Sequence, residues 1–394
     1  MEGFAPEVAV VTHAGGKKLE EPLVVRPTSE TIMYEVFSNW IHSYRDLPLL
    51  INQWANVVRW ELRTRLFLRT TEFLWQEGHT VHETESDADE RARMMLDIYK
   101  DFAENYMAIP VVPGTKSESE KFAGALRTYT IEAMMQDGKA LQFSTSHNLG
   151  QNFAQAFNVK FLDRNNTEQY GWQTSWGLST RTIGGLIMVH SDDKGLVLPP
   201  RIASIQVVIT TIGSSESDFT AARTEAEKIG EGLKKESIKF KIDGRDIRAG
   251  EKFYEWEKKG VPLRIELGPK DIANNTAVLV RRDTGDKKII SIDSITQEVK
   301  ILLEQIQKDL YEKAKRYQEE KTKKADSWES FVEEINAGNF VLAHWSGEAE
   351  IEAQIKEKTG ATIRCIPFDQ PDEDGRCILS GKASTKRVLF AKAY

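Results

Sequence analysis

Apolar and polar residues alternate in two runs between Asn56 and Gln76, and a short polar link separates the runs. This pattern is typical of two antiparallel strands joined as a hairpin. Because successive side chains of a strand point to opposite faces, we expect Arg59 and Glu61 on one face of the first strand. One face of the second strand then carries Arg69, Phe73, Trp75 and Glu77.

Charged groups and aromatic rings share this predicted face, although buried charges are costly unless they are paired. One interpretation is a binding pocket, in which arginines hold a phosphate or carboxylate, a ring stacks on a base and an acid holds an amine. The other is a half-exposed hairpin whose charged face meets water. The hairpin alone leaves both interpretations open.

The rest of the pattern divides the chain into three segments. Residues 1–200 mix strands with helices, including one helix over residues 87–106 with apolar residues at helical spacing. Residues 204–300 alternate short strands with helices, which predicts a small α/β domain. We expect its strands at residues 205–209, 240–242, 263–267 and 277–280, and a helix at 218–235. Residues 301–394 continue a long amphipathic helix and end in a small domain.

Two smaller expectations complete this pattern. The charged stretch at residues 313–324, at the end of the long helix, is most often a solvated helix face and only sometimes a phosphate contact. Trp54 and Trp60 are expected in the core.

Composition narrows the class of protein without naming it. The chain has 394 residues, 40% of them hydrophobic, and a formal net charge of −7. This charge argues against a broadly basic surface that coats nucleic acid, but a local basic patch suffices for RNA. No apolar run approaches a membrane span, and no signal peptide is evident at the start. Two cysteines, Cys365 and Cys377, fit a reducing cytoplasm.

Four segments resemble motifs of the class II aminoacyl-tRNA synthetases and follow the order that these motifs have in the family. Their sequences are similar to those of prolyl-tRNA synthetases of the archaeal and eukaryotic type. Residues 67–79, FLRTTEFLWQEGH, resemble motif 2, and residues 175–181, SWGLSTR, resemble motif 3. Residues 26–31 resemble the family's R-P-T-S-E-T loop, and residues 142–153 its Q-x-x-T-S-H-x-L-G-Q-N-F segment. The resemblance extends from residue 3 to residue 394. It favours the interpretation of the charged face of the hairpin as a binding pocket.

The resemblance implies an α+β fold and an activity. Residues 1–200 would form the antiparallel-sheet catalytic core, residues 204–300 an anticodon-binding α/β domain, and residues 301–394 a linker helix and C-terminal domain. The protein would activate L-proline with ATP and Mg²⁺ to prolyl-adenylate and transfer it to tRNA(Pro). Class I signals such as H-x-G-H, and Walker or G-x-G-x-x-G loops, are absent from the sequence.

The resemblance also implies residue roles. Arg59 and Arg181 would be catalytic, Arg59 bridging the prolyl carboxylate and the α-phosphate, while Arg69 and Arg181 hold the outer phosphates. The implied ATP contacts are Arg59, Arg69, Thr70, Phe73, Gln142, Thr145, Ser179 and Arg181. The implied proline contacts are Thr28, Glu30, Arg59, Trp75, Glu77, His147 and Trp176. A lone histidine is more often structural, but the place of His147 within Thr-Ser-His favours the pocket.

Residues 260–271 resemble the anticodon-binding domain of this synthetase group. The positions that match the family's anticodon contacts are Glu257, Arg264, Lys270 and Asp271. The alternative is an ordinary turn, because Gly-Pro-Lys-Asp is good loop chemistry anywhere.

The chain departs from the family pattern at two places. Many relatives bind structural zinc through four cysteines in the last domain, whereas this chain keeps Cys365 and Cys377 and has Ser380 where a cysteine is expected, so we expect no metal site. Motif 1, which builds the dimer interface, is absent before Met1, so we expect a fragment of a homodimeric protein or a truncated paralogue. No long insertion separates motifs 2 and 3, so no editing domain is expected.

Two alternatives remain at this stage. One is a neighbouring class II enzyme such as a threonyl- or glycyl-tRNA synthetase, although a threonyl enzyme holds a pocket zinc whose ligands are missing here. The other is a non-catalytic or truncated relative that binds tRNA.

Overall fold

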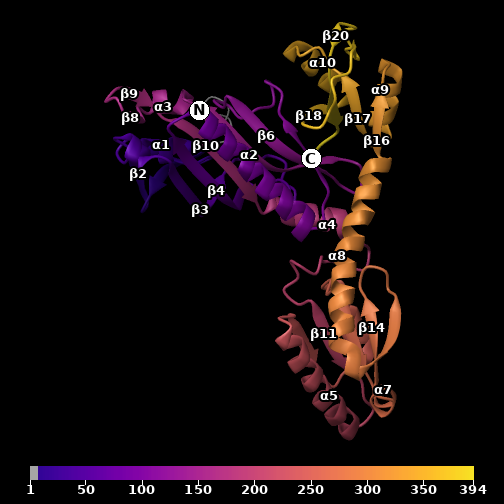
Figure 1. The fold of residues 1–394 in the computed structure, drawn as a ribbon. Helices are drawn as coiled ribbons and strands as arrows, with labels where there is room; N and C mark the ends of the chain where they lie inside the picture. Colours follow the sequence, from indigo (N-terminus) through magenta and orange to yellow (C-terminus); the bar gives the residue numbers. More distant parts are fainter. Residues whose placement is uncertain (1–7) are drawn as a thin grey trace. The chain divides into compact units, whose positions relative to one another are not determined.

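The structure is a computed structural model that describes residues 8–394 (Figure 1). It divides into two compact units. The first contains the described residues up to Asp101, together with Val111–Gly185 and Gln318–Tyr394. The second contains Phe102–Pro110 and Leu186–Tyr317.

A ten-stranded sheet forms the framework of the first unit, and only its β16–β17 pair is parallel. In spatial order the strands are β16 (Thr322–Ala325), β17 (Phe340–His344), β21 (Arg387–Ala391), β18 (Thr362–Pro367), β5 (Val111–Thr115), β6 (Arg127–Met134), β7 (Ala140–Gly150), β10 (Trp172–Ser179), β4 (Glu72–His82) and β3 (Leu49–Val58). The C-terminal segment (residues 318–394), expected as a helix end and a separate domain, therefore adds four strands to the same sheet. The mixed α+β fold class is confirmed.

Helices and short strands surround this sheet. The helices are α1 (Glu30–Phe37), α2 (Glu85–Asp101), α3 (Asn152–Ala156), α4 (Arg181–His190), α9 (Trp328–Asn336), α10 (Ala349–Thr359) and a 3₁₀ turn at Tyr44–Asp46. The short strand pairs are β1 (Ala9–Ala14) with β2 (Lys17–Val25), β8 (Lys160–Leu162) with β9 (Glu168–Tyr170), and β19 (Gly375–Arg376) with β20 (Ala383–Ser384). Helix α2 crosses one face of the sheet over β4, β6, β7 and β10 (Figure 1).

The predicted hairpin is present as the antiparallel pair β3–β4, but its link is longer than the pattern suggested. Residues 59–71 form a loop, so Glu61 and Arg69 lie outside the strands, and their side chains form an ion pair at 3.7 Å. The expectation that Arg59 and Glu61 share a strand face is therefore wrong. The expected core placement of two tryptophans is also wrong, because Trp54 is 84% and Trp60 59% exposed.

The second unit is the predicted α/β domain. Its sheet has the order β12 (Phe240–Asp243), β11 (Val207–Thr211), β13 (Leu263–Leu267), β14 (Thr276–Arg281), β15 (Lys287–Ser291). The first three strands are parallel, and β14 and β15 are antiparallel. The helices are α5 (Glu216–Lys235), α6 (Ala249–Lys258), α7 (Pro269–Ala273), α8 (Ile295–Glu320), a 3₁₀ turn at Ile292–Ser294 and a π turn at Phe102–Tyr106.

Helices α5 and α8 enclose the core of this domain. Ile229 and Leu233 of α5 and Val299, Ile306 and Leu310 of α8 belong to one buried cluster with the sheet. The expected amphipathic character of the long helix is confirmed, because Ile295, Val299, Leu303, Ile306 and Leu310 are buried on one side of it. The sequence predicts a solvated helix face at residues 313–324. The helix ends at Glu320, and residues 322–325 form strand β16 instead. Among the described residues, no helix has the length and apolar character needed to cross a membrane.

One half-buried carboxylate holds α2 on the main sheet. Asp89 of α2 accepts hydrogen bonds from Tyr129 Oη of β6, Asn148 Nδ2 of β7 at 3.0 Å and Arg93 Nε at 2.8 Å. Burial alone would raise the pKa of Asp89, but the hydrogen bonds from Arg93, Tyr129 and Asn148 outweigh it and lower the pKa to about 2.

We predict that Asp89→Ala lowers the free energy of unfolding by about 2–3 kcal/mol at pH 7, because hydrogen bonds to a charged acceptor are lost. A lowered pKa stabilises the folded state above the unfolded value near 4, and this contribution disappears as the pH falls towards 2. The difference between the two proteins in denaturant titrations should therefore shrink over that range. Asp97→Ala, at an exposed position of the same helix, is the matched control. A pH-independent difference would contradict the assignment.

Candidate active site

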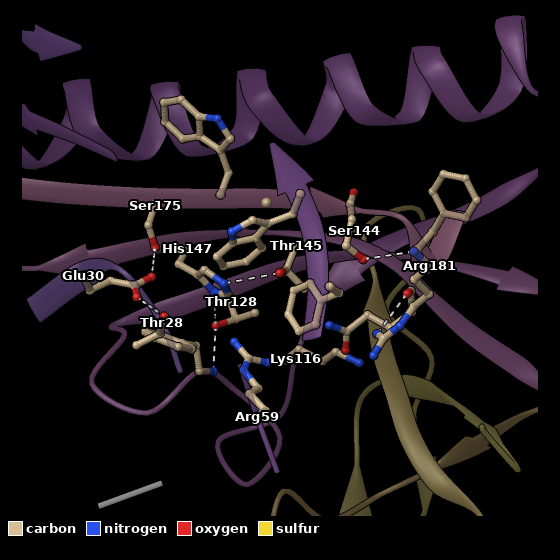
Figure 2. Close-up of a pocket in the computed structure, with 18 of the residues that line it drawn as sticks. Thr28, Glu30, Arg59, Lys116, Thr128, Ser144, Thr145, His147, Ser175 and Arg181 are labelled. Atoms are coloured by element: carbon tan, nitrogen blue, oxygen red, sulfur yellow. Dashed lines mark hydrogen bonds between the residues drawn. The ribbon is translucent and has the colours of Figure 1, made fainter. Parts of the chain in front are cut away.

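A cavity of about 240 Å³ opens on the main sheet of the first unit (Figure 2). Its walls come from β4, β7 and β10, from the start of α1 and α4, and from the segment between β5 and β6. A second cavity of about 140 Å³ adjoins it and shares Arg59, Phe73, Ser179 and Arg181. Figure 2 shows Glu30, Thr28 and Ser175 at one end of the cavity and Arg181 at the other.

Backbone carbonyl groups hold the arginines of the cationic end. Arg59 Nε donates to the carbonyl oxygen of Pro27 at 2.9 Å, and Arg181 Nε donates to that of Leu68 at 3.1 Å. Burial, followed by the positive charges of Arg59 and Arg69, lowers the pKa of Arg181 to about 10. The three guanidiniums thus remain charged at neutral pH and repel one another, an arrangement that a bound polyanion relieves.

Aromatic rings form the middle of the cavity wall. The Arg59 guanidinium lies over the Phe73 ring at 5.3 Å, and Phe73 meets Trp75 edge to face at 5.5 Å. Trp176 of β10 pairs with Gly78 of β4, where an added Cβ would lie 2.2 Å from the indole. The glycine is therefore needed to seat the tryptophan.

The opposite end of the cavity gathers oxygen acceptors. Glu30, the first residue of α1, is only 4% exposed and accepts hydrogen bonds from Thr28 Oγ1 and from Ser175 Oγ, the latter at 3.0 Å. Ser29, which lies between Thr28 and Glu30, has helical rather than extended backbone angles, and the two flanking side chains still meet. A carboxylate in this position can receive an ammonium group.

His147 lies between the two ends. Its Nδ1 contacts Thr128 Oγ1 at 2.9 Å, and its Nε2 contacts Thr145 Oγ1 at 3.2 Å. Burial lowers the pKa of His147 to about 4, so the imidazole is neutral at physiological pH. Its role is to orient neighbours and ligands rather than to add charge.

The structure gathers the predicted ATP residues without exception. Arg59, Phe73, Gln142, Thr145, Ser179 and Arg181 line the main cavity, while Arg69 and Thr70 line the adjoining one. Of the predicted proline residues, Thr28, Glu30, Arg59, Trp75, His147 and Trp176 line the main cavity.

Glu77 is the exception among the predicted proline residues. It is 1% exposed and lies behind the cavity wall, where Gln53 Nε2 contacts its carboxylate at 2.6 Å and His79 Nε2 at 3.0 Å. Burial raises its pKa, but the hydrogen bonds from His79, Ser29 and Gln53 prevail and lower it. Glu77 therefore supports the wall from within the sheet.

Several cavity residues carried no signal in the sequence. Lys116, Glu120 and Phe122 come from the segment between β5 and β6, where polar residues follow no period, and Thr128 lies at the start of β6. Ser144 and Ser175 lie inside recognised motifs but were not singled out. The N–H groups of Trp75 and Trp176 and the Ser144 hydroxyl are buried without a hydrogen-bond partner among residues 8–394. These groups are available to a polar ligand.

The predicted anticodon residues fall into two places in the second unit. Glu257 and Arg264 line one cavity of about 210 Å³, where Arg264 lies over the Phe253 ring at 4.2 Å and pairs with Glu266 at 2.8 Å. Lys270 and Asp271 lie on α7 beyond the other end of β13, and Asp271 Oδ2 accepts from the Gly268 N–H at 2.9 Å. The structure thus does not bring all four residues into one pocket.

The two cysteines of the C-terminal segment are free thiols and form no disulfide. Cys365 is buried in β18, and Cys377 follows β19. Within the part of the chain that the structure describes, no three histidine, cysteine or acidic side chains gather as metal ligands.

Comparison with known proteins agrees with this arrangement. Residues 12–190 match the class II core domain of tRNA synthetases (G, H, P, S and T), residues 206–302 an anticodon binding domain, and residues 328–394 the C-terminal domain of prolyl-tRNA synthetase. The whole chain is 55% identical to a proline–tRNA ligase of Phocaeicola vulgatus and 54% identical to those of Porphyromonas gingivalis and a Roseiflexus species. It spans 83% of the length of each. The chain therefore belongs to the proline–tRNA ligase family of class II aminoacyl-tRNA synthetases.

Proposed function

We propose that this protein activates L-proline with ATP to form prolyl-adenylate and transfers the prolyl group to tRNA(Pro). The observation that carries this proposal is a pair of adjoining cavities, with the Glu30 carboxylate at one end of the larger and three arginines around the region that the two share. An amino acid with a positive nitrogen fits the first end, and a polyphosphate fits the shared region. The proline carboxylate then meets the α-phosphate between them.

The chemistry of this step needs positioning and charge stabilisation more than proton transfer. The attacking carboxylate is already ionised at neutral pH, so no general base is required. Arg59 lines both cavities and would hold the carboxylate and the α-phosphate together. Arg69 and Arg181 would stabilise the outer phosphates, and Phe73 would stack on adenine.

The acceptor end suits proline in particular. Glu30 and Thr28 would receive the secondary ammonium, which has two N–H groups to satisfy. Trp75 and Trp176 would enclose the three-carbon ring in an apolar slot. His147, neutral and held by Thr128 and Thr145, would fix the shape of this slot.

Mg²⁺ would accompany ATP, held mainly by phosphate oxygens and water, and would supply charge neutralisation at the phosphates. Zinc is not part of this proposal, since two cysteines and Ser380 do not make a closed tetrahedral site.

The partners of the reaction follow from the domains. We propose that the second unit binds the anticodon of tRNA(Pro) through Glu257, Arg264, Lys270 and Asp271. We also propose that the protein acts as a homodimer in the cytoplasm. Support for the dimer comes from edge strand β3, where Leu50 and Trp54 are exposed. We assign the archaeal and eukaryotic type from the sequence of residues 67–79. Residues 83–171, which lie between strands β4 and β10 of motifs 2 and 3, hold α2, the π turn, β5, β6, β7, α3, β8 and β9 with short connections.

Arg181→Ala should lower proline-dependent exchange between ATP and pyrophosphate by about 10²-fold or more, because a charge-stabilising donor is lost. The assay should use protein dialysed against a chelator and resupplied with Mg²⁺ alone, with all twenty amino acids tested in turn. Arg164→Ala, at a surface turn between β8 and β9 with a 71% exposed side chain, is the control.

Two results would contradict this proposal. Exchange stimulated by another amino acid but not by proline would assign a different substrate, and no exchange at all would favour a non-catalytic tRNA-binding relative. Activity that returned only with added zinc would refute the metal assignment. An unchanged rate in Arg181→Ala would remove Arg181 from the site.

Arg264→Ala should weaken aminoacylation of tRNA(Pro) by about 1–3 kcal/mol, by analogy with the loss of a specific base contact. Exchange between ATP and pyrophosphate should stay nearly intact, because it requires no tRNA. Since Arg264 also stacks on Phe253, Lys270→Ala on exposed α7 provides a second variant with less structural risk, and Lys258→Ala is the surface control. Equal loss of both activities would indicate a folding role instead.

A further inference from the structure

A buried cluster of charges lies behind the cationic end of the cavity. At its centre is Glu132 of β6, which is 0% exposed. Glu132 Oε2 accepts from both Arg364 Nε at 3.0 Å and Arg364 Nη2 at 2.9 Å, so two donors of the guanidinium meet one carboxylate oxygen. Glu132 Oε1 accepts from Lys116 Nζ at 2.7 Å and from Thr130 Oγ1 at 2.8 Å. Two cations therefore share one carboxylate away from water.

The C-terminal segment contributes one member of this cluster. Arg364 belongs to β18, which pairs with β5 through Ile366 and Pro367. The approach is close, because a Cβ on Gly114 of β5 would lie 2.5 Å from the Ile366 carbonyl oxygen. The backbone of Arg364 takes part as well, since Lys116 Nζ donates to its carbonyl oxygen at 2.7 Å. β18 thus fixes both Glu132 and Lys116.

The cluster reaches the cavity by two routes. Lys116 itself lines the cavity and is drawn between Arg59 and Arg181 in Figure 2. Glu132 stands opposite Gln142 in the β6–β7 pair, next to an irregularity in register. The Gln142 carbonyl oxygen in turn accepts from Arg181 Nη1 at 3.5 Å. Both routes end at the side where the nucleotide is proposed to bind.

The negative charge of Glu132 affects the cations around it. Burial opposes the charge on Glu132, but Arg364 and Lys116 outweigh it and lower the pKa of Glu132, so the carboxylate is ionised. Burial and the charges of Arg59 and Arg69 lower the pKa of Arg181; the negative charge of Glu132 opposes this shift, and the positive charge of Arg364 adds to it. The Glu132 carboxylate therefore offsets part of the repulsion among the cations on this side of the cavity, including that of its own partner Arg364.

We propose that Arg364 and Glu132 are positioning residues for ATP. Arg364 of the C-terminal segment holds the Glu132 carboxylate in place. Glu132 in turn holds Lys116, and the part of the wall where Arg181 contacts Gln142, in the geometry that receives the phosphates. This inference rests on the proposed function. It assigns the C-terminal segment a part in nucleotide binding although neither residue lines the cavity.

The side chains of Glu132 and Arg364 contact Lys116, Thr130 and Thr362 rather than Glu30 or His147. The link to the acceptor end is through the backbone, where the Lys116 N–H donates to the carbonyl oxygen of Thr128, whose hydroxyl contacts His147.

A purely structural role predicts a different result. If the pair only stabilised the sheet, its loss would reduce the fraction of active enzyme, so kcat would fall while both KM values stayed constant. A positioning role raises the KM for ATP and leaves the KM for proline nearly unchanged. The ratio of the two KM values therefore separates the alternatives.

The experiment measures proline-dependent ATP–pyrophosphate exchange for Glu132→Gln, Arg364→Met and Arg364→Lys, with ATP and proline varied separately. Glu132→Gln and Arg364→Met should each raise the KM for ATP about tenfold, the order seen when a group behind a binding residue is lost, and change the KM for proline by less than about twofold. Arg364→Lys keeps the charge but not the two donors that meet Glu132 Oε2, and it should lie between wild type and Arg364→Met. Arg376→Met, at an exposed arginine of the same segment, should match wild type.

Each outcome decides the question. Unchanged KM values with a lower kcat, or equal increases in both KM values, would overturn the proposal. If Arg364→Met fails to fold, Arg364→Lys still tests the proposal. The second measurement for this variant is the rise in Tm caused by each ligand. The rise caused by ATP should be smaller than in wild type, and the rise caused by proline should be the same. Wild-type protein without proline-dependent exchange would instead refute the proposed function.

Discussion

Mutual repulsion among Arg59, Arg69 and Arg181 is the constraint on which the first unit depends. Three guanidiniums around one partly buried site oppose folding unless each is held and partly neutralised. The structure meets this demand in a specific way. Backbone carbonyls of Pro27 and Leu68 receive two of the guanidiniums, Glu61 pairs with the third, and Glu132 acts from behind the wall. The rigid sheet is what keeps these partners in place.

The opposite end of the cavity is built on the reverse principle. There the groups are acceptors or neutral: Glu30 with its two hydroxyl donors, and a histidine whose burial keeps it uncharged. A zwitterionic ligand that reacts through its carboxylate is thereby oriented along the cavity, with its nitrogen away from the arginines. The division of charge within a space of about 240 Å³ thus supplies both binding and direction.

Local patterns in the sequence predicted what depends on local physics. Period-two alternation located the β3–β4 hairpin, helical spacing located α2, α5 and α8, and the alternating elements of residues 204–300 identified the α/β sheet. The length of the loop at residues 59–71 was missed because charged residues in that loop happen to continue the alternation. Trp54 and Trp60 were misplaced because burial depends on which face of an edge strand is covered, and the strand pattern does not state this.

Long-range pairing accounts for the other differences. Nothing near Lys116 or Thr128 marks them as cavity residues, because they reach the site only once β5 and β6 have joined β7. The C-terminal segment looked like a separate domain because its strands are short and follow a long helix. In the structure β18 pairs with β5, and Arg364 crosses to Glu132, a residue 232 positions earlier in the chain. An ion pair buried at such a strand junction requires correct register on both sides. The pairing of β18 with β5 therefore also places the Arg364 guanidinium beside Glu132, behind the wall of the cavity.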